Sequence, residues 1–396
     1  SFAIACLVAG RESVFVARND SPLVLGLAEE STYIASDVPA FREFTDQVVY
    51  LDDGEFAELT VDSWNVTDTG GDPVDKSTET VEWDPEDTGK SGYDHFMLKE
   101  IHEQPRALRQ CLRGRVDELG GTVTVEELGD LDLDRVHLVA AGTSYHAALY
   151  GSQMLAADGI PAQAYYAHEY ASSPPPIENA TVVGVSQSGE TADTLAATRE
   201  ARRHGAETLA LTNTVGSTMA RECDDVFYIR SGPEIGVAAT KTFAGQQTAL
   251  NLLTQVARSG GTDRDAVSAL RDLPGDVQTV LDESNAEAVA EAYLDADAYF
   301  FIGRGLNYPV ALEGALKMKE ISYEHAEGFA AGELKHGPLA LVTADTPVFA
   351  TVVGDDELAQ KTIGNIKEVE ARDAPVVAIT DGRSDVERYA DHTLEI

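Results

Sequence analysis

The sequence predicts an α/β protein with two doubly wound parallel-sheet domains that follow a β-rich N-terminal part. From residue 135 onward, short apolar β-branched runs alternate with helical patterns, as in open parallel sheets. A strand, a glycine turn and a helix begin at His137 and again at Tyr299, which indicates an internal duplication. Residues 1–65, in contrast, show only short strand patterns separated by turns.

The β-rich part spans residues 1–65. We expect strands at 3–9, 13–17, 23–27, 32–35, 47–51 and 56–60. Residues 66–93 are acidic and rich in Thr, Gly and Asp, and are interpreted as a linker. A connecting helix over 93–112 follows, with an apolar stripe that is interrupted near Pro105. Linker and helix together occupy residues 66–113.

The first doubly wound domain is expected over residues 114–270. Its predicted strands are 136–140, 163–166, 182–185, 208–211 and 226–229, and its predicted helices are 145–157, a helix from Thr191 and a long helix over 237–258. The glycine at 205 suits the end of the helix that starts at Thr191. These elements alternate in the order that a parallel sheet requires.

The second domain is expected over residues 271–396. A helical stretch over 273–298 leads to strands at 299–302, 348–353 and 376–380 and to helices at 309–322 and 357–372. The chain begins at Ser1 directly inside a strand pattern and stops at Ile396 inside an edge-strand pattern. We therefore expect that a part is missing at each end.

A hydroxyl-rich loop lies where the strand 182–185 ends and the next helix begins. Ser186, Gln187, Ser188 and Thr191 occupy this loop, and it contains no lysine and no GxxxxGK[ST] pattern of a nucleotide P-loop. The free N–H groups of a helix N-terminus and the hydroxyls favour a phosphate dianion. The alternative is that these hydroxyls only cap their own helix.

A second hydroxyl pair, Thr143 and Ser144, follows the first strand of the same sheet. Because ligands of open α/β sheets bind at the carboxyl ends of the strands, both loops are expected on one rim. Two hydroxyl-rich loops on one rim predict a sugar phosphate as the ligand.

The helix 309–322 carries carboxylates and lysines at helical spacing. Glu313, Lys317, Glu320 and Glu324 fall at i, i+4, i+7 and i+11, which places them on one face. The alternative is ordinary ion pairing on a solvated face. The functional interpretation is a glutamate held ionised by a lysine, which acts as a base and stabilises an enolate.

His336 lies in a glycine-bounded segment after this helix. A histidine titrates near neutral pH, so the residue suits general acid/base catalysis. The alternative is an ordinary surface histidine.

The charge of the chain limits its partners. It has 29 Lys and Arg against 68 Asp and Glu, a formal net charge of −39. Nucleic acid and anionic membranes need basic patches, so neither is expected as a partner. Acid spread over a whole surface suits solubility at high salt, where screening removes self-repulsion, and a halophilic host is the hypothesis.

The cysteines and histidines predict no metal site. Cys6, Cys111 and Cys223 lie far apart and are odd in number, which favours a reducing cytosol, and the nine histidines form no HExxH pattern. No apolar run reaches the ~20 residues of a membrane span, and no signal peptide is evident. A cytoplasmic protein is expected.

Five motifs in order resemble those of the glutamine–fructose-6-phosphate aminotransferase (isomerising) family. They are Gly142-Thr-Ser-Tyr145, Ser186-Gln-Ser-Gly-Glu-Thr-Ala-Asp-Thr194, Glu234-Ile-Gly-Val-Ala-Ala-Thr-Lys241, Leu312-Glu-Gly-Ala-Leu-Lys-Met-Lys-Glu-Ile-Ser322 and Gly332-Glu-Leu-Lys-His-Gly-Pro338. The resemblance implies two sugar isomerase (SIS) domains after the β-rich remnant of an N-terminal-nucleophile glutaminase domain. It also implies a homodimer and no metal, nicotinamide or flavin cofactor.

The resemblance assigns roles to the candidate residues. The sugar phosphate would be held by Thr143, Ser144, Ser186, Gln187, Ser188 and Thr191, with Val237 lining the site. Glu320 would move the proton between C1 and C2 of a fructosimine, tuned by Lys317 with Glu313 behind it. His336 would assist ring opening, reaching in from the neighbouring subunit. Fructose 6-phosphate and glutamine-derived ammonia would thus give glucosamine 6-phosphate.

The chain departs from the family pattern at three places. Residues 1–65 resemble only the last third of the glutaminase domain, without its cysteine nucleophile, and the family's tail with its Schiff-base lysine is missing after Ile396. Ala239 stands where the family commonly has serine. These departures put the activity of the chain by itself in doubt.

Two other functions remain open. One is another SIS-domain sugar-phosphate isomerase or an amino-sugar-phosphate deaminase, against which the β-rich part speaks. The other is a non-catalytic sugar-phosphate-binding regulator, for which a helix-turn-helix and basic charge would be expected.

Overall fold

The computed structural model describes residues 2–19, 21–60, 63–81, 89–117, 120–129, 133–259 and 261–396. Its N-terminal part, the β-rich part, contains two antiparallel sheets. One has the order β1–β2–β6–β7–β8 and the other β4–β3–β5–β9. The strands are β1 (Phe2–Leu7), β2 (Val14–Asn19), β3 (Val24–Leu27), β4 (Thr32–Ala35), β5 (Gln47–Tyr50), β6 (Phe56–Leu59), β7 (Trp64–Thr67), β8 (Pro73–Val74) and β9 (Glu79–Thr80), with a 3₁₀ turn η1 (Val38–Ala40).

Part of the stretch interpreted as a linker belongs to these sheets. β8 pairs with β7, and β9 pairs with β5. The sequence did not predict these strands, because a strand of two residues shows no alternation of apolar and polar residues. Residues 82–88 of the same stretch lie outside the described residues.

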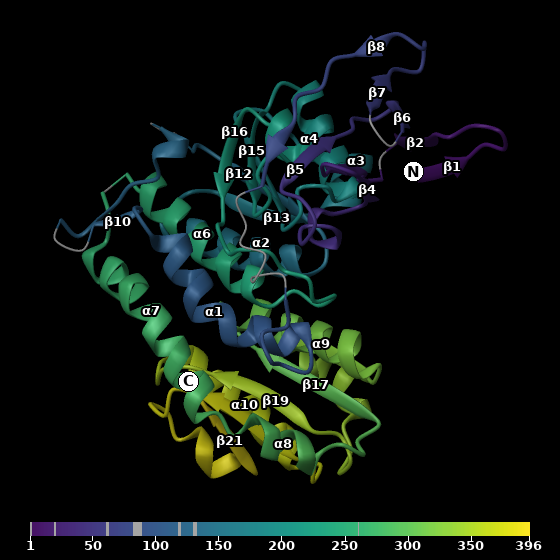
Figure 1. The fold of residues 1–396 in the computed structure, drawn as a ribbon. Coiled ribbons are helices and arrows are strands. Elements are labelled where there is room, and N and C mark those ends of the chain that lie inside the picture. The colour runs from purple at the N-terminus through teal and green to yellow at the C-terminus, as the bar shows by residue number, and fades with distance from the viewer. Residues whose placement is uncertain are drawn as a thin grey trace.

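The connecting helix is α1 (Phe96–Leu112), which runs without interruption through Pro105. After α1 in the sequence come a small hairpin of β10 (Val116–Asp117) and β11 (Thr122–Val123) and a 3₁₀ turn η3 (Glu126–Leu128). Figure 1 shows α1 between the upper and the lower parallel-sheet domains. It packs on α6 and α7, so the segment that connects the two parts of the chain is fixed by contacts along its length.

The first doubly wound domain contains a five-stranded parallel sheet of order β13–β12–β14–β15–β16. Its strands are β12 (Val136–Ala140), β13 (Ala162–Tyr166), β14 (Thr181–Ser186), β15 (Glu207–Thr212) and β16 (Asp225–Tyr228); its helices are α2 (Thr143–Ala157), α3 (Ala167–Ser172), α4 (Ala192–Arg203), α5 (Thr218–Glu222) and α6 (Lys241–Ala257). β14 is buried along its whole length, as expected for a central strand.

The second domain repeats this plan, with the sheet order β18–β17–β19–β20–β21 and all pairs parallel. Its elements are β17 (Ala298–Gly303), α9 (Asn307–Ser322), β18 (His325–Ala330), η4 (Ala331–His336), η5 (Pro338–Leu341), β19 (Val348–Val352), α10 (Glu357–Glu370), β20 (Val376–Thr380), η6 (Val386–Tyr389) and β21 (His392–Glu395). In both sheets the second strand in the sequence (β13 or β18) lies at the edge beside the first (β12 or β17), and the later strands follow on the other side. The duplication predicted from the sequence is therefore confirmed in the topology.

In the second domain the sequence analysis missed one strand and misplaced several helix ends. β18 had no counterpart in the prediction, because a glycine and a glutamate interrupt its apolar pattern. The stretch 273–298 is not one helix but the end of α7 (Arg264–Glu283) and a separate α8 (Ala286–Ala292). The expected domain boundary at 270 therefore falls inside α7, which packs on α1.

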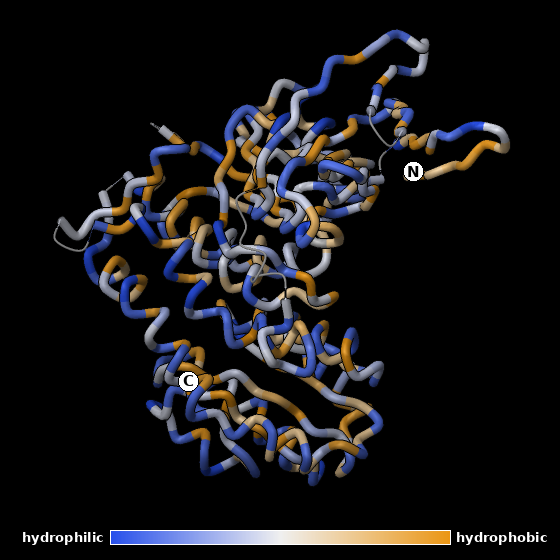
Figure 2. The backbone as a smooth tube through the Cα atoms, in the orientation of Figure 1, coloured by the Kyte–Doolittle hydropathy of each residue, from blue (hydrophilic) through white to orange (hydrophobic). Residues whose placement is uncertain are grey.

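Each of the two parallel sheets is covered by helices on both faces. In the first domain Val183 belongs to the core cluster with residues of α2 and α6, whereas its neighbour Val182 belongs to the cluster with α3 and α4. This alternation follows from the period of two along a strand. In Figure 2, hydrophobic segments follow the strands of the lower sheet, whose core includes Phe300 and Ile302. Among the helices described, none is long and apolar enough to span a membrane.

Candidate active site

The hydroxyl pair Thr143 and Ser144, the first along the chain, lies at the carboxyl end of β12. The chain turns at Gly142, whose φ of 55° is in the left-handed region that glycine adopts without strain, and α2 begins at Thr143. Ser144 is buried, and its Oγ accepts a hydrogen bond of 2.9 Å from Gln246 Nε2 of α6. Thr143 instead directs its hydroxyl toward the second domain.

The second hydroxyl-rich loop, residues 186–191, follows the neighbouring strand β14. Ser186 Oγ lies 2.8 Å from Thr191 Oγ1 and accepts a hydrogen bond of 3.0 Å from the N–H of Gly189. Ser188 Oγ accepts a hydrogen bond of 3.1 Å from the N–H of Glu190. Thr191 precedes the first residue of α4. Because β12 and β14 pair in parallel, both hydroxyl loops lie at one edge of the sheet, as predicted.

The loop 186–191 is supported by the next strand connection. The carbonyl of Gln187, itself half-buried, accepts a hydrogen bond of 3.0 Å from the N–H of Asn213, which follows β15. The N–H of Met219 donates to the carbonyl of Gly189 at 3.0 Å, and the N–H of Thr218 donates to Glu190 Oε1 at 2.6 Å. The loop is therefore held by the residue that follows β15 and by the start of α5 (Thr218–Glu222).

The carboxylate–lysine face of α9 packs against α2 at this same edge. Glu313 is buried, and its Oε1 accepts a hydrogen bond of 2.9 Å from Thr143 Oγ1. Lys317 Nζ donates to Thr143 Oγ1 at 2.9 Å and lies 3.3 Å from Glu313 Oε1. The structure thus joins the first hydroxyl pair of one domain to the helix motif of the other.

Lys317 is shared between two carboxylates. Its Nζ also lies 2.5 Å from Glu320 Oε2. Glu313 is almost fully buried, with 6% of its side chain exposed, whereas Glu320 keeps 33% exposed and can meet a ligand. The alternative of a merely solvated ion-pair face does not fit a carboxylate as buried as Glu313.

The fourth member of the predicted face lies elsewhere. α9 ends at Ser322, and Tyr323 adopts a left-handed φ of 63° at its C-cap. Glu324 therefore lies beyond the helix and is exposed. The predicted helix 309–322 also ends at Ser322, so the i+11 spacing assigned Glu324 to a face that the helix does not reach.

Val237 lies in the loop that precedes α6 and is 95% exposed. Glu100 of α1 holds this loop: its Oε1 accepts from the N–H of Ile235 at 2.6 Å and of Gly236 at 3.1 Å. Burial raises the pKa of Glu100, and the two backbone donors counteract that rise. Helix α6 begins at Lys241, four residues later than predicted, because residues 232–240 form this loop.

His336 is the last residue of η4 and is exposed. β18 separates it from α9, so it does not follow that helix directly as expected. Within the described part of the chain, no hydrogen bond or ion pair joins His336 to Glu313, Lys317 or Glu320.

Sequence reasoning missed three residues that complete the site. His146 Nδ1 lies 2.7 Å from Glu313 Oε2, Gln246 binds Ser144, and Glu100 holds the loop of Val237. Only His146 carried a signal, since it lies one turn after Thr143 on the same helix face. In the described residues, no group of three or more His, Cys, Asp or Glu side chains could hold a metal ion.

Comparisons with known proteins show the family of the chain. The family described as SIS domain matches residues 132–256 and 293–396. Glutamine–fructose-6-phosphate aminotransferase [isomerizing] of Halobacterium salinarum is 49% identical over all of this chain and 68% of its own length. The chain belongs to the glutamine–fructose-6-phosphate aminotransferase family. The resemblance seen in the five motifs is thereby confirmed.

Two further members support the assignment to the glutamine–fructose-6-phosphate aminotransferase family. The Methanosarcina acetivorans enzyme of the same name is 46% identical over all of this chain and 66% of its own length. The C-terminal domain of glucosamine-fructose-6-phosphate aminotransferase from Francisella tularensis superposes with a TM-score of 0.71 at 33% identity, covering 78% of this chain and 91% of that domain. The chain thus spans about two thirds of the length of these full-length relatives.

Proposed function

We propose that this chain carries the isomerase half of a glutamine–fructose-6-phosphate aminotransferase, which converts fructose 6-phosphate and glutamine to glucosamine 6-phosphate and glutamate. The observation that carries the proposal is the contact of Thr143 with both Glu313 and Lys317. It brings the acid–base face of α9 to the edge of the sheet where the hydroxyl loops lie. A phosphate and a reacting carbon of one sugar could then be held at the same time.

The phosphate would bind in the loop 186–191. Ser186, Ser188 and Thr191 supply hydroxyls, and the N-terminus of α4 supplies free N–H groups and the positive end of its dipole. Ser144, Thr143 and Gln187 would contact the sugar, and Val237, which is almost fully exposed in the loop before α6, would line the site.

Glu320 would transfer the proton between C1 and C2 of the imine that ammonia forms with the sugar. It is the carboxylate of the α9 motif that remains accessible. Lys317 lies between Glu320 and Glu313, and its positive charge would stabilise the developing enol oxygen. Glu313 in turn is bonded by Thr143 and His146, which hold the carboxylate that Lys317 contacts.

The wider setting is part of the same proposal. His336, exposed at the end of η4, would assist ring opening from the neighbouring subunit of a homodimer. The β-rich part would belong to a glutaminase-type domain, and glutamine-derived ammonia would be the nitrogen source. We place the protein in the cytoplasm of a halophilic host, on its charge and its three free cysteines.

Binding of sugar phosphates tests the proposal. Titration calorimetry of this chain with fructose 6-phosphate or glucosamine 6-phosphate should show binding, and unphosphorylated glucosamine should bind at least about a hundredfold more weakly, since charge-assisted hydrogen bonds to the dianion are lost. Replacement of Ser188 by Ala should weaken binding of the phosphorylated sugars but not binding of glucosamine. Equally tight binding of glucosamine and glucosamine 6-phosphate, or no binding of any of these sugars, would contradict the proposal.

A further inference from the structure

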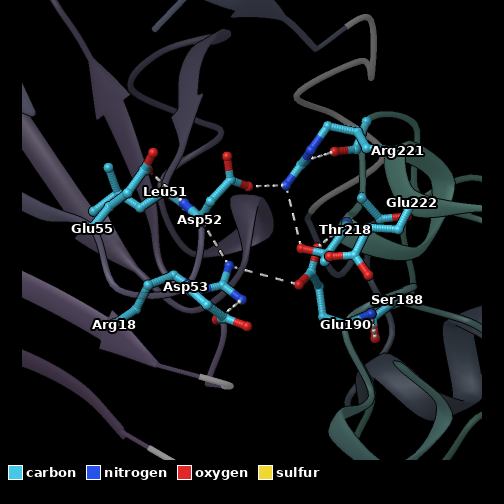
Figure 3. Close-up of polar contacts among 12 residues, drawn as sticks. Arg18, Leu51, Asp52, Asp53, Glu55, Ser188, Glu190, Thr218, Arg221 and Glu222 are labelled. Atoms are coloured by element: carbon cyan, nitrogen blue, oxygen red, sulfur yellow. Dashed lines mark hydrogen bonds and ion pairs between the residues drawn. The ribbon is translucent and has the colours of Figure 1, made fainter. Parts of the chain in front are cut away.

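Charged side chains cross the boundary between the β-rich part and the first SIS domain. Figure 3 shows Arg18, Asp52 and Asp53 of the β-rich part facing Glu190 and Arg221 of the SIS domain. Arg221 Nη2 lies 2.7 Å from Asp52 Oδ1, and Arg18 Nη1 lies 3.8 Å from Glu190 Oε2. This boundary therefore includes a residue of the hydroxyl-rich loop.

Arg18, on β2, is fixed within the β-rich part. Only 2% of its side chain is exposed. It donates to Leu51 O at 2.8 Å and to Asp53 Oδ1 at 3.0 and 3.2 Å. Its Nη1 also faces Glu190 Oε2 across the boundary. A guanidinium held by two groups of its own domain presents a rigid cation to the other domain.

Glu190 is part of the loop that would bind the phosphate. Its N–H bonds Ser188, and it directly precedes Thr191. Its Oε1 accepts from the N–H of Thr218 at 2.6 Å, whereas its Oε2 is buried without a hydrogen-bond partner among the described residues. The ion pair with Arg18 is the compensation that the structure gives to this buried oxygen, and leaving a buried charge uncompensated is costly.

The negative charge of Glu190 acts on the β-rich part as well. Burial raises the pKa of Asp37, at the start of η1, and the Glu190 carboxylate raises it further. Arg18 itself lies between two carboxylates, Asp53 of its own part and Glu190 across the boundary. Loss of this arginine would leave Glu190 free to turn toward solvent and the loop 186–191 less ordered.

We propose that Arg18 and Glu190 form a positioning pair that couples sugar-phosphate binding in the loop 186–191 to the docking of the β-rich part. The inference rests on the proposed function, because it takes this loop as the phosphate site. Docking of Arg18 fixes the backbone of Glu190 and with it the hydroxyl of Ser188, so part of the ordering cost of binding is met in advance. By linkage, a bound sugar phosphate strengthens the docking equally.

A double-mutant cycle in the whole chain tests the pair. Glu190→Gln keeps an acceptor for the N–H of Thr218 but removes the charge, and Arg18→Gln removes the partner. Each variant should weaken binding of glucosamine 6-phosphate by about five- to tenfold, and the double variant should bind no more weakly than either. The matched control is Arg199→Gln, which removes a contact of 3.3 Å to Asp53 across the same boundary and an ion pair of 2.7 Å with Glu222 within the SIS domain, but no contact of the loop 186–191, and should bind as the parent does.

Hydrogen exchange supplies a second readout that does not depend on Arg18→Gln folding well. Glucosamine 6-phosphate should slow amide exchange in β2 of the parent chain, and should not do so in Glu190→Gln at a ligand concentration that saturates it. Unchanged or tighter binding by Glu190→Gln, additive effects in the cycle, or ligand protection of β2 in that variant would overturn the pair. If the parent binds no sugar phosphate, the proposed function fails first and the inference fails with it.

Discussion

At the scale of single residues, the site depends on one buried carboxylate with three partners. Glu313 is bonded to Thr143 and His146 and lies beside Lys317. Helical spacing predicted the pairing of Glu313 with Lys317, because both lie on α9. It could not predict Thr143 or His146 as partners, because these residues are about 170 positions away and reach Glu313 only through the packing of α2 on α9.

The base can be tested by a change that preserves its shape. Glu320→Gln in a catalytically competent enzyme should reduce hexose-phosphate isomerisation by about 10²–10⁴-fold, the usual contribution of one general base, while binding of glucosamine 6-phosphate changes less than about threefold. Rates and calorimetry measure the two effects. Glu324→Gln, in an exposed residue just beyond the helix, is the control. Retained isomerisation would remove Glu320 as the base.

A buried histidine predicts part of the pH dependence of stability. Burial lowers the pKa of His137, and Arg135 lowers it further. The unfolded chain takes up a proton near pH ~6.5, whereas the folded chain does so only at lower pH. The stabilisation is therefore complete above about pH 6.5 and is lost as the pH falls through the lowered pKa of the folded state.

Urea unfolding at about pH 7.5 and about pH 5.5 measures this loss. His137→Gln, which can still bond the Tyr170 hydroxyl 3.1 Å from His137 Nδ1, should lose less stability between the two pH values than the parent, by up to ~1.4 kcal/mol per pH unit. Carboxylates contribute equally to both proteins and cancel. The same loss in both would show that His137 is not responsible.

At the scale of elements, the loop 186–191 needs glycine at one position. Gly189 has a φ of 66°, and a Cβ there would collide with Ser217 Oγ. Gly189→Ala should cost ~2–4 kcal/mol of stability and abolish sugar-phosphate binding, because both the backbone and the neighbouring turn must shift. Thermal unfolding and calorimetry check this result.

The matched control lies at the other end of the following helix. Gly205 also has a positive φ, of 82°, but a Cβ there meets nothing within 4 Å. Gly205→Asn should therefore cost no more than ~1 kcal/mol and leave binding intact, since Asn tolerates the left-handed region. Equal damage from both substitutions would mean that the collision at Gly189 does not matter.

Elements with a strong local pattern were predicted correctly, and those formed by tertiary contacts were not. β12, β14 and α10 were expected within two residues of their bounds, because apolar runs and helical periodicity mark them. β18 carries a mixed sequence and is defined by its pairing with β17. β8 and β9 likewise exist only through the strands beside them.

At the scale of the whole molecule, the duplication brings two half-sites together. The sequence analysis predicted the repeat and the rim of hydroxyls, but not that α9 of the second copy packs on α2 of the first. No local pattern reports such an arrangement, because it depends on the relative placement of two similar domains. The same limit applies to the pair Arg18 and Glu190, which are 172 positions apart and belong to different domains.

The net charge of −39 predicts that the stability of the protein depends on the salt concentration. The Debye length is ~10 Å at 0.1 M salt and ~3 Å at 1 M, so surface carboxylates repel one another much less at high salt. The melting temperature should rise by roughly 10 °C or more between about 0.1 M and about 2 M KCl, as measured by scanning calorimetry. A melting temperature that is independent of salt would exclude this halophilic adaptation.

The central claim is that two hydroxyl loops and one helix of the other domain hold a single phosphorylated hexose. A crystal structure with glucosamine 6-phosphate tests it most directly. The account predicts the phosphate within hydrogen-bond distance of Ser186, Ser188 and Thr191, and the Glu320 carboxylate within ~3.5 Å of C1 or C2. A sugar bound elsewhere, or a Glu320 side chain turned away from it into solvent, would contradict the account.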